Sequence, residues 1–175
     1  SQLARPMLAD LCKKTDETIN LGLPDVLDLF VVDSYQGSRL LHATAYGGWR
    51  SLYHCTALGK AFMANWDHPM RETVYLLRGL PKLTPDTITD VEKLEAQLAQ
   101  FAVQGYAIDM GENEVGVNGI SSAIINGLGE VAAAISVAGH SNRLTKEAMQ
   151  KIAPDVIHAA NLIQEVLGGK GHLKP

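Results

Sequence analysis

His54 and Cys55 are adjacent, and this pair could act as a thiol with its general base or as two metal ligands. No further cysteine lies nearby, and no histidine follows at the spacing of a metal site. In a strand, neighbouring side chains point to opposite faces, so the two would not meet. The sequence therefore favours a structural histidine beside a small buried cysteine, and it predicts no metal site.

Three acidic residues, Asp109, Glu112 and Glu114, could form a general acid–base set. The two glutamates occupy a short acidic connector, which we expect to be a solvated loop. Asp109 follows Tyr-Ala-Ile at the expected end of a strand, where side chains often line a cleft. Ser136 is a single polar residue in an apolar strand, so its hydroxyl is either satisfied by the backbone or faces a ligand. Asp109 and Ser136 are the better site candidates.

A helix start is another kind of site. Thr56 is the expected N-cap of a helix over residues 56–66, and the unpaired N–H groups of such a first turn suit a carboxylate. Every helix has such an end, so this feature alone is not specific. Residues 127–129 read Gly-Leu-Gly, but they lie between two expected strands rather than at a strand-to-helix turn, which excludes a dinucleotide fingerprint. No cofactor is predicted.

Composition restricts the class of protein. The chain has 175 residues, 46% apolar and 19% charged, which indicates one globular domain rather than a disordered chain. No apolar run could cross a membrane, no secretory signal is visible, and two cysteines make no disulfide framework, so the cytoplasm is the expected compartment. A net charge of -4 argues against direct contact with nucleic acid. Because the chain begins with Ser1 and enters a helical pattern at once, we expect it to be part of a longer protein.

Hydrophobic periodicity predicts the elements that position these residues. Helices are expected over residues 3–14, 56–66, 91–105 and 146–166, the third opened by a capping box of Thr89 and Glu92. Strands are expected over 19–23, 27–37, 39–45 and 106–109, and a hairpin pairs 120–125 with 131–137. The first strand alternates Ile19 and Leu21 with polar or small residues, as a half-buried strand does. This order predicts an α+β fold with a largely antiparallel sheet.

Six short runs in register resemble the effector-binding domain of the IclR family of bacterial transcription regulators. The runs are Leu-x-x-Leu-x-x-x-Thr-x-Glu-Thr-x-Asn-Leu over 8–21, His-Cys-Thr-Ala-Leu-Gly-Lys-Ala over 54–61, Leu-Thr-Pro-Asp-Thr-Ile-Thr-Asp over 83–90, Gly-Tyr-Ala-Ile-Asp over 105–109 with Glu112, Gly116 and Val117, Ala-Ala-Ile-Ser-Val-Ala-Gly over 133–139, and Arg-Leu-Thr over 143–145. No single run is diagnostic, but their order and spacing match over nearly the whole chain.

The resemblance implies a GAF-like fold, in which a curved sheet carries helices on its faces. It also implies a winged helix-turn-helix domain preceding this chain, so that DNA is contacted only through that missing domain. Residues 1–16 would be a linker helix, 17–169 the effector-binding domain and 170–175 a C-terminal tail. The family implies a homodimer or homotetramer that senses a small-molecule effector, often an organic or aromatic acid, and no membrane contact.

Site residues carry over from the family position by position. The backbone at Ala57 and Leu58 would receive a carboxylate, Asp109 and Ser136 would supply side-chain hydrogen bonds, and Val117 would supply apolar contact. The remaining candidates come from departures from the family pattern. Gly119 and Ala138 are small, whereas other family pockets carry polar side chains at these positions. Asn118 and His140 are also candidates, because either could supply the missing polar group. The departures predict either a larger ligand or a polar group placed differently.

Three functions compete at this stage. The leading one is a ligand-sensing regulatory domain without catalytic residues, which alters DNA occupancy through its oligomer. The second is a small enzyme that acts on an organic acid with Cys55, or with Asp109 and Ser136. The third is an assembly module whose pocket binds no ligand.

Overall fold

The computed structural model describes residues 2–40, 42–43 and 47–168 of the chain. Within these ranges the helices are α1 (Arg5–Thr15), α2 (Ala57–Asn65), α3 (His68–Leu77), α4 (Val91–Gln104) and α5 (Lys146–Val166). The strands are β1 (Thr18–Pro24), β2 (Leu29–Tyr35), β3 (Trp49–Ser51), β4 (Ala107–Met110), β5 (Val117–Ile125) and β6 (Val131–His140).

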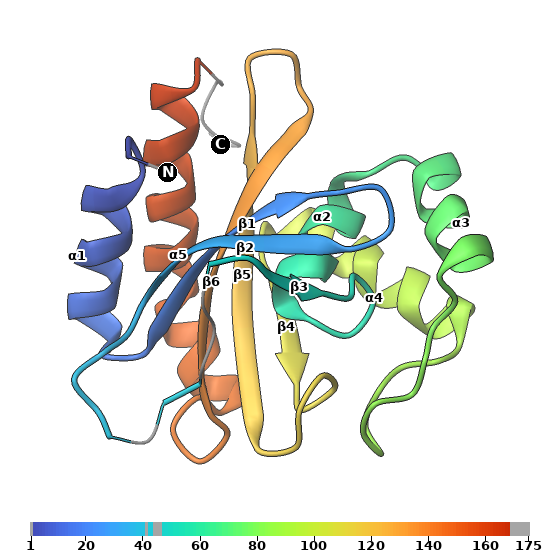
Figure 1. The fold of residues 1–175 in the computed structure, drawn as a ribbon, viewed down its shortest axis with the longest axis horizontal. Helices are drawn as coiled ribbons and strands as arrows, with labels where there is room; N and C mark the ends of the chain where they lie inside the picture. The colour runs from blue at the N-terminus through green and yellow to red at the C-terminus, as the bar shows by residue number, and fades with distance from the viewer. Residues whose placement is uncertain (1, 41, 44–46, 169–175) are drawn as a thin grey trace.

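The strands form one sheet in the order β3-β2-β1-β6-β5-β4, and every neighbouring pair is antiparallel. The sheet curves between two groups of helices: α1 and α5 lie side by side on one side of it, and α2, α3 and α4 lie on the other (Figure 1). This arrangement confirms the predicted α+β class with a curved antiparallel sheet and helices on its faces. The predicted hairpin is present as β5 and β6.

Side-chain size differs between the two faces of the central strands. Large apolar residues such as Ile19, Ile120 and Ile135 face α1 and α5 and form one hydrophobic core. The alternate residues, which face α2, are small or polar, and they include Asn20 and Ser136. Both faces of β1 are buried, so this strand is not half-buried as its alternation predicted. The small side chains let α2 approach the sheet closely and leave space near its first turn.

Three local expectations are wrong or incomplete. The strand expected over 39–45 is absent from residues 39–40 and 42–43, and residues 41 and 44–46 lie outside the described part of the chain. The third strand is β3, which comes later and follows the glycine pair at 47–48. The N-cap of α4 is Asp90, whose carboxylate accepts from the Lys93 N–H, so Thr89 and Glu92 form no capping box. Helix α3 was not predicted, although Asp67 caps it and Pro69 stands in its first turn.

The predicted domain boundaries remain predictions. Helix α1 ends at Thr15, close to the expected end of the linker helix, and Leu8 and Leu11 pack into the same core as α5. Residue 1 and the expected tail at 170–175 lie outside the described residues.

Candidate functional site

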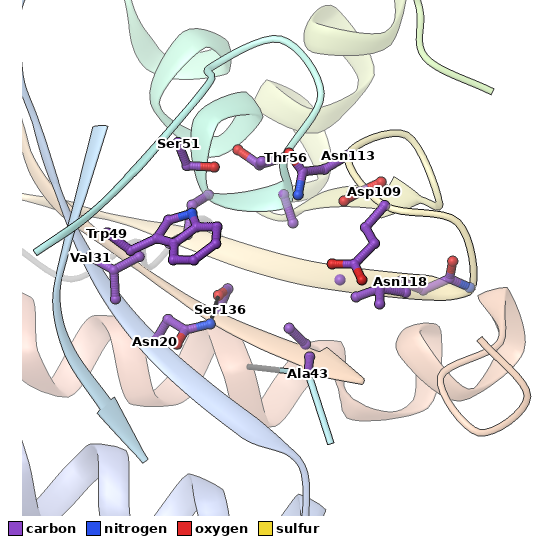
Figure 2. Close-up of a pocket in the computed structure, with 16 residues that line it drawn as sticks. Asn20, Val31, Ala43, Trp49, Ser51, Thr56, Asp109, Asn113, Asn118 and Ser136 are labelled. Atoms are coloured by element: carbon purple, nitrogen blue, oxygen red, sulfur yellow. Dashed lines mark hydrogen bonds between the residues drawn. The ribbon is translucent and has the colours of Figure 1, made fainter. Parts of the chain in front are cut away.

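A cavity of about 130 Å³ lies between the first turn of α2 and the sheet (Figure 2). It is lined by Asn20, Val31, Ala43, Trp49, Ser51, Thr56, Ala57, Leu58, Asp109, Asn113, Glu114, Val117, Asn118, Gly119, Ser136 and Ala138. All the site residues expected from the sequence are in this set except His140. The fold therefore brings together segments that are more than a hundred residues apart in the chain.

The first turn of α2 presents open backbone donors to the cavity. Thr56 is its N-cap: the side-chain oxygen accepts from the Gly59 N–H at 3.1 Å, and the carbonyl accepts from the Lys60 N–H at 2.9 Å. Among the described residues, no hydrogen-bond acceptor takes the N–H groups of Ala57 and Leu58. Two adjacent N–H groups at a helix N-terminus form a site for an anionic oxygen.

The sequence folds this way locally because Gly59 allows a close approach. A Cβ built on Gly59 would lie 2.2 Å from the carbonyl oxygen of Tyr53, a separation that no side chain tolerates. The loop before α2 therefore lies directly against the helix. The Tyr53 hydroxyl fixes the loop further by donating to the Asp25 carbonyl at 2.7 Å.

A row of paired residues crosses four strands beneath α2, and three of its members, Ala138, Gly119 and Asp109, line the cavity. Thr18 on β1 pairs with Ala138 on β6, Ala138 with Gly119 on β5, and Gly119 with Asp109 on β4. The two middle residues of this row are small, and the residue at its end carries a carboxyl group. A Cβ on Gly119 would lie 3.2 Å from the Cβ of Ala57, so the helix already fills part of the space that the glycine leaves.

Asp109 is the strongly perturbed acid of the site. Its side chain is 6% exposed, and one carboxyl oxygen accepts from the Glu112 N–H at 2.7 Å. Burial raises the pKa of Asp109 to about 7, and the negative charge of Glu112 adds to this effect. Near neutral pH this carboxyl group can therefore either accept a hydrogen bond as the anion or donate one as the acid.

The expectation that Glu112 lies in a solvated loop is wrong. Its side chain is buried and forms an ion pair with Lys60 of α2, whose side chain has no exposed surface. Lys60 also donates to the Gln97 side chain of α4 at 2.6 Å. Glu114 is exposed, as expected, and lines the cavity. Sequence reasoning missed Lys60, although a lysine within an otherwise apolar helix signals a buried partner.

Asn20 also lines the cavity and was not singled out from the sequence. It is 6% exposed, and its Nδ2 donates to Ser136 Oγ at 3.5 Å while its Oδ1 accepts from Ser34 Oγ at 2.8 Å. Its alternation with Ile19 and Leu21 predicts a half-buried strand, whereas α2 covers this face as well. An asparagine between apolar residues in a central strand was the available signal.

The domain as a whole matches known proteins. A family model described as "Bacterial transcriptional regulator IclR C-terminal" matches residues 1–165. The chain belongs to the IclR family. The HTH-type transcriptional repressor AllR of Escherichia coli (strain UTI89 / UPEC) is 31% identical over 175 residues, which cover 98% of this chain and 63% of the relative. A second relative, the transcriptional repressor IclR of Escherichia coli (strain K12), is 28% identical over 169 residues, so both of these relatives are transcriptional repressors.

Solved structures agree with this assignment. The crystal structure of Thermotoga maritima IclR superposes with a TM-score of 0.91 at 27% identity, covering 95% of this chain and 68% of that one. The inducer-binding domain of the transcription factor PobR from Acinetobacter, a double mutant in complex with 3-hydroxybenzoic acid, gives 0.85 at 25% identity, covering 94% and 97%. The chain spans about 63% of the length of the curated relatives it matches first. No described helix is long and apolar enough to cross a membrane.

Two positions where this IclR chain departs from the family pattern direct no side-chain donor into the cavity. His140 lies outside it, and its Nδ1 accepts from the Asn142 N–H at 3.2 Å. Asn118 lines the cavity, but its Nδ2 donates to the Leu144 carbonyl at 2.9 Å and its amide points away from the open space (Figure 2). Asn20, rather than His140 or Asn118, therefore supplies a polar side chain to the cavity.

His54 and Cys55 show no preparation for catalysis. The His54 ring bonds the Pro81 carbonyl at 3.0 Å, and burial lowers its pKa. Burial raises the pKa of the Cys55 thiol to about 12, so it is not a thiolate at neutral pH. Within the described ranges, no group of three or more His, Cys, Asp or Glu residues could hold a metal ion.

Proposed function

We propose that this chain is the sensory domain of an IclR-type regulator and that its cavity binds a small carboxylic acid. The observation that carries the proposal is the pair of open N–H groups at Ala57 and Leu58, which face the same cavity as the buried Asp109 and Ser136. A carboxylate at the helix start would accept from both N–H groups and would interact favourably with the helix dipole.

The cavity volume indicates the size of the ligand. At about 130 Å³ it is slightly smaller than the roughly 150 Å³ engineered cavity that holds benzene. An aliphatic acid of about five to eight non-hydrogen atoms matches this space. Aromatic acids are the second class, because the related PobR domain was solved with 3-hydroxybenzoic acid.

Because the cavity lining is acidic, Asp109 would have to be protonated when an anionic ligand binds. Among the described residues, no lysine or arginine lines the cavity, while Asp109 and Glu114 do. An anionic ligand beside an ionised Asp109 would be repelled at low effective dielectric. The raised pKa of Asp109 removes this conflict, because the carboxyl group can take up a proton and then donate to a ligand oxygen.

We further propose how binding is read out. In the longer protein, an N-terminal domain would bind DNA, and the acid would shift the population of a homodimer or homotetramer toward one arrangement. Such coupling typically amounts to about 1–3 kcal/mol. The bacterial cytoplasm is where such a regulator would act.

A thermal-shift screen tests the proposal. The panel holds acids of two to five carbons, their hydroxy and oxo derivatives, and benzoates. An acid at 100 times its dissociation constant should stabilise the domain by about 2.7 kcal/mol. Asp109→Ala and Ser136→Ala should abolish the shift, whereas Asp10→Ala, on the exposed surface of α1, should retain it. A broad panel without any shift would instead support the assembly module.

A further inference from the structure

A second row of polar residues crosses four strands beside the cavity. Asn20 on β1 pairs with Ser34 on β2 and with Ser136 on β6, and Ser136 pairs with Ser121 on β5. Directly paired residues in an antiparallel sheet project to the same face. The row therefore lies on the side of the sheet that α2 covers, next to the row that ends at Asp109.

Hydrogen bonds join three members of this row. Ser34 Oγ donates to Asn20 Oδ1 at 2.8 Å, and Asn20 Nδ2 donates to Ser136 Oγ at 3.5 Å. Asn20 and Ser136 are 6% and 3% exposed and line the cavity, whereas Ser34 does not line it. Ser34 is half-buried on β2, so it holds the Asn20 side chain from outside the cavity.

The direction of these hydrogen bonds determines which donors remain for a ligand. Ser136 accepts from Asn20, so the Ser136 hydroxyl proton and the second Nδ2 proton of Asn20 remain available as donors. An acceptor oxygen on a ligand would take these donors and align the chain from Ser34 through Asn20 to Ser136. Inside a protein, aligned hydrogen bonds of this kind strengthen one another.

The position of the row sets what it would recognise. Asn20 and Ser136 lie across the cavity from Thr56, which begins the helix, and from Asp109, with the Trp49 ring nearby (Figure 2). A carboxylate held at the helix start would thus place its other end toward Asn20. A purely aliphatic end would leave two buried donors without a partner, which is unfavourable.

We propose that Asn20 is a specificity-determining residue and that Ser34 is its positioning residue, so that the cavity selects acids carrying a second oxygen at the end remote from the bound carboxylate. The ligand class is then hydroxy, oxo or dicarboxylic acids rather than simple alkanoic acids. This inference rests on the proposed function. It adds a residue outside the cavity, Ser34, whose effect depends on the ligand oxygen.

Isothermal titration with butyrate, 3-hydroxybutyrate and succinate tests the inference. The wild-type domain should bind at least one of the two oxygen-bearing acids more tightly than butyrate. Ser34→Ala should weaken that acid about fivefold, the effect of one net hydrogen bond, and leave butyrate unchanged. Ser34→Thr, which keeps the hydroxyl, should restore the preference. Ser121→Ala is the matched control, because the buried Ser121 Oγ has no hydrogen-bond partner among the described residues.

The outcomes separate this inference from the proposed function. Equal binding of all three acids by the wild type, or equal weakening of all three by Ser34→Ala, overturns the role of the row and leaves the sensory domain standing. Absence of binding by any acid in the broad panel overturns both. Circular dichroism of each variant checks that the fold is retained, and Asn20→Asp gives a second test at the same position, since it removes the donors without removing volume.

Discussion

Gly119 on β5 and Ala57 on α2 lie in direct contact, such that a Cβ on the glycine would be 3.2 Å from that of Ala57. This contact brings the first turn of α2 down onto the sheet. The two open N–H groups consequently lie within the same cavity as Asp109, the register partner of Gly119 on β4. The small size of Gly119 therefore determines where the proposed anion site lies.

Enlarging Gly119 should displace the helix start. We expect Gly119→Val to destabilise the domain by about 1–3 kcal/mol, the usual cost of overpacking, and to abolish acid binding because the N–H groups move. Urea unfolding and the thermal-shift screen measure the two effects. Gly47→Ala is the control, since among the described residues its Cβ would meet only the Val32 carbonyl, at 3.5 Å. Unchanged stability and binding in Gly119→Val would show that the contact does not position α2.

The buried ion pair of Lys60 and Glu112 gives a second prediction. Lys60→Met should destabilise the domain by about 3–5 kcal/mol, because it leaves the Glu112 carboxylate buried without its cation. The double variant Lys60→Met/Glu112→Leu should recover most of that loss, since no charge is then buried. Urea unfolding of the two single variants and the double variant gives the coupling energy. Purely additive effects would mean that the pair does not interact as the structure shows.

The third prediction concerns stability against pH. The folded pKa of Asp109 is about 7, whereas an unfolded aspartate has about 3.9, so the folded state retains a proton between these values that the unfolded state has lost. Stability should therefore fall as pH rises through this window, by at most about 1.4 kcal/mol per unit.

Asp109→Asn isolates this contribution, because the amide oxygen can still accept from the Glu112 N–H. The variant should be more stable than the wild type at pH 8, and the difference should shrink toward pH 5 and vanish near pH 4. Thermal melts across this range measure it, with Asp10→Asn on the exposed face of α1 as the matched control. A constant difference between variant and wild type at every pH would contradict the raised pKa.

The sequence predicted some features well because they depend on neighbours along the chain. The predicted N-cap Thr56 accepts from the N–H group three residues later, and the hairpin of β5 and β6 follows from its turn residues. Family-specific runs placed Asp109 and Ser136 at one cavity, as the structure shows.

Features that depend on distant partners could not be predicted in this way. From its neighbours along the chain, Glu112 is expected to be a solvent-exposed loop residue. The fold instead buries it against Lys60, which lies 52 residues earlier. The alternation along β1 likewise predicts that Asn20 is exposed to solvent, but α2 covers that face of the strand. The strand expected over 39–45 is absent from residues 39–40 and 42–43, whereas Trp49–Ser51 pairs with β2.

The last prediction links acid binding to the proton on Asp109. If the bound anion requires the protonated carboxyl group, binding takes up a proton whenever Asp109 is ionised in the free domain. Above the pKa of the ligand's own carboxyl group, the association constant should be constant up to about pH 6 and should fall, by up to tenfold per unit, as pH rises above the Asp109 pKa of about 7. The other charged groups near Asp109 are Glu114 at the cavity and the Lys60–Glu112 ion pair behind it. Titrations in buffers of different ionisation enthalpy count the proton directly. In Asp109→Asn the affinity should be independent of pH and no proton should be taken up; a wild-type affinity that does not change between pH 6 and 9 would exclude protonated Asp109 as a ligand donor.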